Sequence, residues 1–229
     1  MTKITISNCI NILIQLYILS LYIFTYREGY NSISNVIAGL LITLILFNNI
    51  FKRKRIVVNG FIVAYILFLI ICLISILFAV DQNVAFIKVR TLFLLALLMF
   101  SIINYIDSIE KLDKLISGFI FSGLIASIYI VITSDFSQIA RFGDYLGNVN
   151  AVGMIIGISA TFSFYRFLEQ KKLIYLIILI IMFVMILLTG SRKSILFILM
   201  NVVIILYLKN RDSGKITTKI KFLILCFLI

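Results

Sequence analysis

The sequence predicts an all-α membrane protein, a polytopic bundle of transmembrane helices. Hydrophobic residues make up 63% of the 229 positions and charged residues only 13%, whereas a soluble domain is typically about 45–50% apolar and about 25% charged. The apolar residues are also gathered into runs near the length that crosses a bilayer. Lipid favours helices because each helix satisfies its own backbone, and the alternation typical of membrane strands is absent from these runs.

Eight apolar runs are predicted to span the membrane completely. They cover residues 10–26, 33–50, 56–80, 91–105, 115–133, 151–167, 173–189 and 194–208. The first is expected to be a retained helix, because no small-x-small cleavage site follows it. A ninth run begins at Phe222 and stops at Ile229, and about 12 Å of helix would cover less than half of roughly 30 Å of hydrocarbon. We therefore expect residues 1–229 to be a single transmembrane domain from the N-terminal part of a longer protein.

The basic residues that separate these runs predict the orientation of the chain. Fifteen of the 21 Lys and Arg residues fall on the side of the N-terminus, and six fall on the other side. The smaller set consists of Arg27, Lys88, Arg90, Arg141, Arg192 and Lys193. Because cytoplasmic loops carry the excess of Lys and Arg, the N-terminus is predicted to be cytoplasmic. The net charge of +12 then reflects topology and attraction to anionic membrane lipids, and no nucleic-acid partner is expected.

The residue content excludes several kinds of chemistry from this chain. It has no His, so it holds no Ser-His-Asp triad and no His-ligated metal. Cys9, Cys72 and Cys226 lie in or beside apolar runs without metal-ligand spacing, and we interpret them as buried structural thiols. All nine acidic residues fall in loops or at span edges. This argues against a proton-coupled transporter, which usually needs a carboxylate within the membrane.

Two stripes of small residues predict close helix packing. They are spaced four residues apart on two different spans and consist of Gly118, Ser122 and Ala126, and of Gly153, Gly157 and Thr161. Small residues let helix backbones approach in a membrane, so we interpret both stripes as structural.

A candidate anion site lies in the tight turn between the seventh and eighth spans. Gly190 is suited to the sharp bend, and Ser191 to capping the next helix. Arg192 and Lys193 then fall in the first turn of that helix, where cations are unfavourable because the helix N-terminus is already positive. An anion bound between these cations and the free backbone N–H groups would relieve this repulsion.

The longest predicted outer loop has a similar pattern. Arg141, Gly143, Asn148 and Asn150 precede the sixth span, and either Asn is a plausible helix cap. The alternative interpretation is that each outer Arg, including Arg90 near the fourth span, only reaches lipid headgroup phosphates. Ser191 and the two Asn residues would then be ordinary caps.

The two motifs together resemble the O-antigen ligase and O-antigen polymerase superfamily. Its outer-loop signature, an Arg and a Gly before Asn-x-Asn at a helix start, is similar to residues 141–151, RFGDYLGNVNA. Its second signature, a Ser-Arg turn between helices, is similar to residues 187–194, LLTGSRKS. A weaker similarity covers Ser75 to Arg90. The two stronger motifs both lie within residues 134–208, which we take as the signature region. Val149 departs from the Asn-Pro-Asn form that is frequent in the family.

The resemblance implies a metal-independent membrane glycosyltransferase without a cofactor, in the bacterial cytoplasmic (inner) membrane. Its donor would be a glycan on undecaprenyl diphosphate, and its acceptor a sugar hydroxyl or a lipid core, in lipopolysaccharide or capsule assembly. Arg141 and Arg192 would hold the donor diphosphate, with Arg90 and Lys193 as lesser candidates. Asn148, Asn150, Gly143 and Ser191 would shape the loops. The family's catalytic His would lie beyond Ile229.

Two other interpretations of the sequence remain. A polysaccharide flippase or other transporter is also a long helical bundle, although broken helices and internal symmetry are not visible in this sequence. An inactive remnant of a truncated gene is the second. Within the resemblance, ligase and polymerase differ only in the acceptor, and no residue of this chain separates them.

Overall fold

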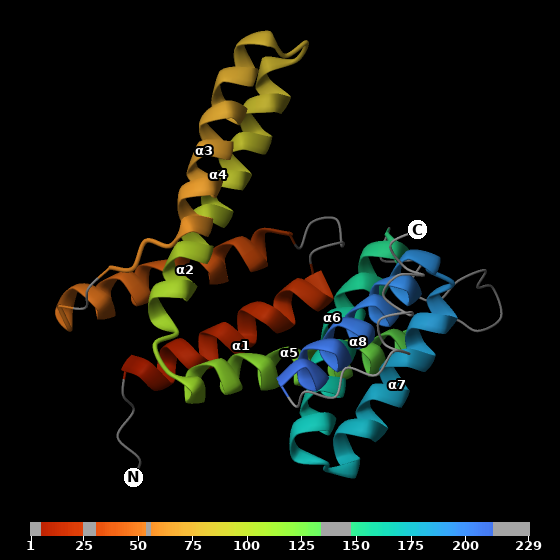
Figure 1. Cartoon of the computed structure of the whole chain (residues 1–229). Coiled ribbons are helices and arrows are strands. Elements are labelled where there is room, and N and C mark those ends of the chain that lie inside the picture. The colour runs from red at the N-terminus through yellow and green to blue at the C-terminus, as the bar shows by residue number, and fades with distance from the viewer. Residues whose placement is uncertain (1–5, 25–30, 54–55, 134–147, 213–229) are drawn as a thin grey trace. The chain divides into compact units, whose positions relative to one another are not determined.

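The computed structural model describes residues 6–24, 31–53, 56–133 and 148–212, and this part of the chain is all-α. It contains eight α-helices, one short 3₁₀-helix and no strand (Figure 1). This confirms the predicted fold class. The helices are α1 (Ile6–Phe24), α2 (Asn31–Phe51), α3 (Gly60–Ser75), α4 (Gln82–Tyr105), α5 (Ile109–Thr133), α6 (Val149–Gln170), α7 (Leu173–Thr189) and α8 (Arg192–Asp212), and the 3₁₀-helix η1 is Ile76–Phe78.

Six of these helices are long and apolar enough to cross a membrane, judged by length and composition. They are α1, α2, α3 with η1, α4, α5 and α6. Helix α7 is apolar but shorter, at 17 residues. The number of spans and the cytoplasmic N-terminus stay predictions, and the run that begins at Phe222 lies outside the described residues.

Side-chain caps explain where α3 and α4 begin. Asn59 Oδ1 accepts the Ile62 N–H at 3.0 Å at the start of α3, and Asp81 Oδ1 accepts the Val84 N–H at 3.0 Å at the start of α4. The Asp81 cap corrects one expectation, because α4 begins at Gln82 and not near Thr91. Apolarity marks the part of a helix that suits lipid, whereas the cap marks where the helix starts.

The chain forms two compact units. The first consists of Met1–Ile14 and Asn35–Lys114, and the second of Gln15–Ser34 and Leu115–Ile229. In the first unit α3 packs on α4, and the Tyr105 hydroxyl donates to the Ser7 carbonyl at 3.0 Å. In the second unit α6 packs along both α7 and α8.

The core of the second unit is built by side chains from four helices. Its buried members are Ile130, Val152, Ile156, Ala160, Met182, Met185, Ile186 and Ile198. Because Ile130 of α5 joins Val152 and Ile156 of α6 in this cluster, the C-terminal part of α5 lies level with the start of α6. The core therefore ties the N-terminal half of α6 to its three neighbours.

Close approach at glycines confirms the predicted packing of the small-residue stripes. A Cβ on Gly157 would lie 3.3 Å from the Phe197 ring of α8, and one on Gly118 would lie 3.4 Å from Gln15 of α1. The tightest position is Gly123, which the predicted stripe does not include. A Cβ there would overlap the Ser159 side chain of α6.

Candidate functional site

The turn between α7 and α8 has the conformation that its residues predict. Gly190 has φ 64° and ψ 16°, a left-handed conformation that glycine adopts without steric cost. Ser191 Oγ accepts the Ser194 N–H at 3.3 Å and so caps α8. Thr189, Ser191 and Ser194 are all buried. The turn is thus a packed element held by its own hydroxyl groups.

A chain of hydroxyl groups joins this turn to the start of α6. Ser194 Oγ donates to the Asn150 carbonyl at 3.4 Å. Ser191 Oγ and Ser194 Oγ also form a 2.7 Å hydrogen bond in which either hydroxyl can donate. A Cβ on Gly153 would lie 2.6 Å from Ser194 Oγ and 3.2 Å from Ser191 Cβ. Only glycine lets the two segments approach this closely.

Helix α6 begins at the same place with its own cap. Asn148 Oδ1 accepts the Ala151 N–H at 3.1 Å, so Asn148 and not Asn150 is the cap. The side chains of both Asn residues are exposed. The N-termini of α6 and α8 therefore lie side by side, and each presents backbone N–H groups and the positive end of a helix dipole.

The two cations of the turn lie where the sequence places them. Helix α8 begins at Arg192, so Arg192 and Lys193 occupy its first turn, and both side chains are exposed. Within the described residues neither side chain forms an ion pair or a hydrogen bond. Among the described residues, two helix N-termini and two cations without a partner thus gather at this junction, an arrangement suited to a phosphate or carboxylate.

The structure brings together five of the eight residues predicted for the site. Asn148, Asn150, Ser191, Arg192 and Lys193 lie at the junction of α6 with the α7–α8 turn. The other three are not part of that junction as the structure describes it. Arg141 and Gly143 fall outside the described residues, and Arg90 belongs to the other compact unit.

The position of Arg90 on its helix also differs from the expectation. It was expected to open the fourth span, but it lies in the third turn of α4 because that helix begins at Gln82. Its side chain is exposed.

Three further residues of the junction are not among the predicted site residues. Thr189 and Ser194 supply hydroxyl groups to the turn, and Gly153 admits Ser194. Thr189 and Ser194 lie within the motif at residues 187–194, so a search for hydroxyls beside a short turn would find them. Gly153 belongs to a predicted packing stripe, which signals close packing but does not identify Ser194 as the partner.

Comparison with protein-family models, curated proteins and solved structures found no match. The resemblance of residues 141–151 and 187–194 to a family therefore stays a prediction. The geometry itself carries the argument for the site.

Proposed function

We propose that this chain belongs to a membrane glycosyltransferase of the O-antigen ligase and polymerase type. It would transfer a glycan from undecaprenyl diphosphate to a sugar hydroxyl at the outer face of the bacterial cytoplasmic membrane. One observation supports this proposal most: the start of α6 packs against the α7–α8 turn and leaves Arg192 and Lys193 exposed at a second helix N-terminus. Residues 148–151, the described end of the first motif, thus lie next to the second motif.

The electrostatics of this junction favour a diphosphate over a neutral ligand. The first N–H groups of each helix lack a partner in the helix, and an anion at such a terminus is typically stabilised by about 0.3–1 kcal/mol before side chains contribute. Arg192 adds a planar group that can bind two phosphate oxygens at once. Lys193 adds a point charge beside it. The ion that suits this site carries more than one negative charge and several acceptor oxygens.

In the proposed reaction, negative charge develops on the leaving diphosphate. An oxygen–carbon bond forms between the acceptor hydroxyl and the anomeric carbon, and the bond from that carbon to the diphosphate oxygen breaks. The electron pair stays on the diphosphate, and the hydroxyl proton passes to a base. Arg192 and Arg141 would stabilise the leaving diphosphate, with Lys193 and Arg90 assisting. The chain has no His, so the proposal assigns no base to these residues.

A binding experiment tests the diphosphate assignment directly. The full chain is purified in detergent, and its affinity for undecaprenyl diphosphate is measured by native mass spectrometry. We expect Arg192→Ala to weaken binding at least about tenfold, the usual effect of losing a hydrogen bond to a charged group. Lys52→Ala removes an exposed cation from the turn after α2, in the other compact unit, and should leave the affinity unchanged.

The outcome separates this proposal from simple contact with lipid headgroups. If Arg192 only reaches headgroup phosphates, the Arg192→Ala and Lys52→Ala proteins will bind the diphosphate equally, and the assignment is wrong. In cells, Arg192→Ala or Arg141→Ala in the full-length protein should abolish polymer transfer without changing membrane insertion. Wild-type polymer levels in both variants would also contradict the proposal.

A further inference from the structure

The second compact unit has a pocket at the opposite end of α6 and α8 from the candidate site. Its volume is about 340 Å³. The lining residues are Tyr165, Leu168 and Glu169 of α6 and Ile205, Leu208 and Lys209 of α8. The pocket is amphipathic, with aliphatic side chains from both helices next to a cation, a carboxylate and a phenol. No part of the proposed function uses it.

The Lys209 ammonium group is fixed at this pocket by a hydrogen bond that uses one of its N–H donors. Its Nζ donates to the Leu168 carbonyl at 2.6 Å. That carbonyl is one of the last four in α6, which lack partners within the helix. An ammonium group has three N–H donors, and the bond to Leu168 uses one. Lys209 thus links α8 to the end of α6 and keeps a charged donor at the rim of the pocket.

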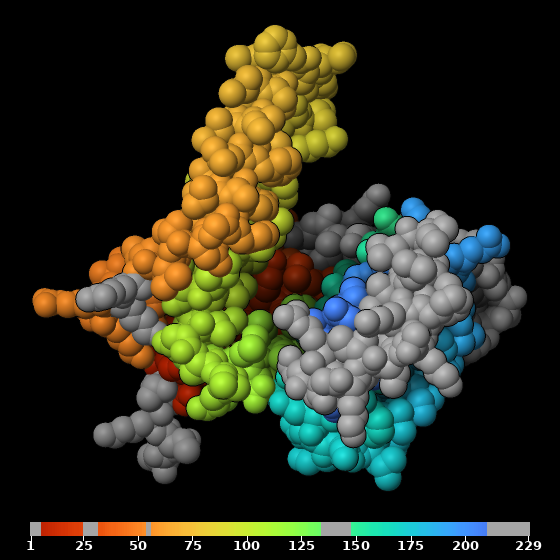
Figure 2. Space-filling view, in the orientation of Figure 1, coloured from red at the N-terminus to blue at the C-terminus, as the bar shows by residue number. Residues whose placement is uncertain are grey.

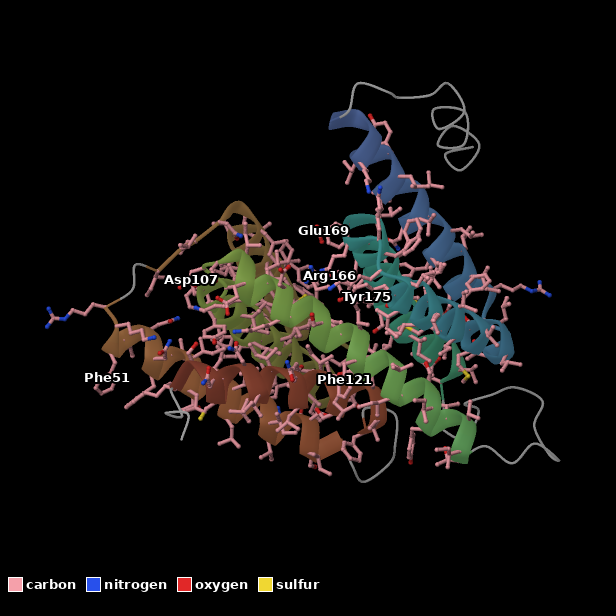
Figure 3. The ribbon with its side chains drawn as sticks, turned by 90° about the horizontal axis from the view of Figure 1, so that it is seen from below. Phe51, Asp107, Phe121, Arg166, Glu169 and Tyr175 are labelled. Carbon is pink, nitrogen blue, oxygen red and sulfur yellow. The ribbon has the colours of Figure 1, made fainter. Side chains whose placement is uncertain are left out.

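The other charges around the pocket leave it net positive. Arg166 Nη1 lies 3.3 Å from Glu169 Oε2, and the two side chains lie together at this end of α6 (Figure 3). This pairing offsets the carboxylate, which would otherwise repel an anion. Lys171 and Lys172, both exposed, form the turn that follows α6. Among the side chains described at this end of α6 and α8, four cations thus accompany one carboxylate, Glu169, which is paired with Arg166.

We propose that this pocket binds an anionic glycerophospholipid. The phosphate would accept from Lys209, and an acyl chain would lie along Leu168, Ile205 and Leu208. A membrane lipid fits because the pocket joins an apolar wall to a cationic rim on helices that suit a bilayer. This end of α6 is also on the predicted cytoplasmic side, the side for which basic segments attract anionic lipid. The proposal does not depend on the proposed transferase activity.

The absence of Trp from the chain allows a fluorescent reporter without background. Tyr165→Trp places one indole in the pocket, and Tyr207→Trp places one on α8 at the same end. Tyr207 does not line the pocket. Each full-length variant is reconstituted in phosphatidylcholine vesicles. Brominated phosphatidylglycerol or brominated phosphatidylcholine is then added at equal mole fraction, and quenching of the indole reports which lipid is adjacent.

We expect the pocket reporter to select the anionic lipid. Brominated phosphatidylglycerol should associate near Trp at position 165 about fivefold more strongly than brominated phosphatidylcholine, the effect of roughly one specific Lys contact. The reporter at position 207 should show a smaller preference, caused by general attraction of anionic lipid. Adding Lys209→Gln should reduce the preference at position 165 to that control level. Soluble glycerophosphate should not compete, because it lacks the acyl chain.

Four outcomes would overturn the proposal. The first is equal quenching by the two lipids at position 165. The second is an equal preference at positions 165 and 207, which would indicate only a diffuse attraction to the basic surface. The third is loss of the preference when soluble glycerophosphate is added, which would show a phosphate site without a lipid. The fourth is a Lys209→Gln variant that keeps the full preference, because the proposed phosphate contact would then be absent.

Discussion

Helices α3 and α6 belong to different compact units, and they show opposite relations between hydropathy and burial. The α3–η1 segment is the most apolar of the six candidate spans, yet only 11% of its most apolar window is buried. For α6, the least apolar of the six, the buried share is 44%. Apolar side chains such as Phe68 and Ile71 face outward from the α3–α4 pair, whose surface is visible in Figure 2. Of these two helices, the more apolar one faces outward and the less apolar one lies at the core.

The physical reason is that lipid offers apolar side chains the same environment as a protein interior. Burying Leu or Ile between helices therefore gains little in a membrane, and close packing and polar contacts decide which helices associate. Helix α6 has the residues for both, because Gly153 and Gly157 allow close approach and Ser159 bonds to two other helices. Helix α3 has a single side-chain bond to α4, from the Tyr65 hydroxyl to the Leu92 carbonyl at 3.3 Å.

The largest difference in the free energy of unfolding should come from truncating an isoleucine in each unit. Ile186 of α7 is fully buried in the core cluster, whereas Ile70 of α3 is 47% exposed. Ile186→Ala leaves a cavity and should lower the free energy of unfolding by about 2 kcal/mol or more. Ile70→Ala should change it by less than about 0.5 kcal/mol. SDS titration in mixed micelles, followed by near-ultraviolet circular dichroism, measures both. Equal losses would mean that α3 is packed as tightly as α7.

A pair of glycine substitutions should give changes of opposite sign. Ala at position 123 would overlap the Ser159 side chain, so Gly123→Ala should destabilise the protein by about 1–3 kcal/mol. A Cβ on Gly39 of α2 meets nothing within 4 Å, so Gly39→Ala should stabilise by up to about 1 kcal/mol through helix propensity. Thermal unfolding in detergent, read by the fraction of monomer after heating, distinguishes them. A stabilising Gly123→Ala would show that the α5–α6 contact is loose.

The smallest difference in the free energy of unfolding should come from removing one tyrosine hydroxyl in each unit. The Tyr22 hydroxyl contacts Ser159 Oγ and donates to the Ile155 carbonyl at 3.1 Å. Tyr22→Phe should therefore cost about 0.6 kcal/mol and at most about 1.7 kcal/mol, the range measured for hydrogen bonds between membrane helices. Tyr65→Phe breaks one longer bond and should cost less. The same SDS titration applies, and a larger loss for Tyr65→Phe would reverse the ranking of the two units.

The sequence predicts the helices well because apolar runs and capping residues are local signals. All eight complete runs correspond to helices. The starts are less predictable, as α4 shows, because Gln82 to Arg90 are polar enough to end an apolar run but still form helix. The packing partners are not predictable from local signals. The contact of Tyr22 with Ser159 joins residues 137 positions apart.

Local and long-range features also separate in the candidate site. The bend at Gly190 and the cap by Ser191 follow from residue type and are confirmed. Residue type leaves Asn148 and Asn150 open as the cap of α6, and the structure assigns the cap to Asn148. Lys193 lies in the first turn of α8, as expected. The contact of the start of α6 with the α7–α8 turn depends instead on Gly153 fitting against Ser194. The spacing of the small-residue stripe predicts close packing at Gly153 but does not identify its partner.

The short link between α7 and α8 also bears on how the chain is made. Only two residues, Gly190 and Ser191, separate the two helices. Insertion of α7 into the bilayer is therefore closely coupled to insertion of α8. If the predicted orientation holds, Arg192 and Lys193 must cross the membrane during synthesis, although basic residues in short loops resist translocation. The two helices then enter as one hairpin, and the apolar length of α7 has to outweigh two charges. Lys193→Gln would ease insertion and Ser191→Arg would hinder it, whatever either does to the finished protein.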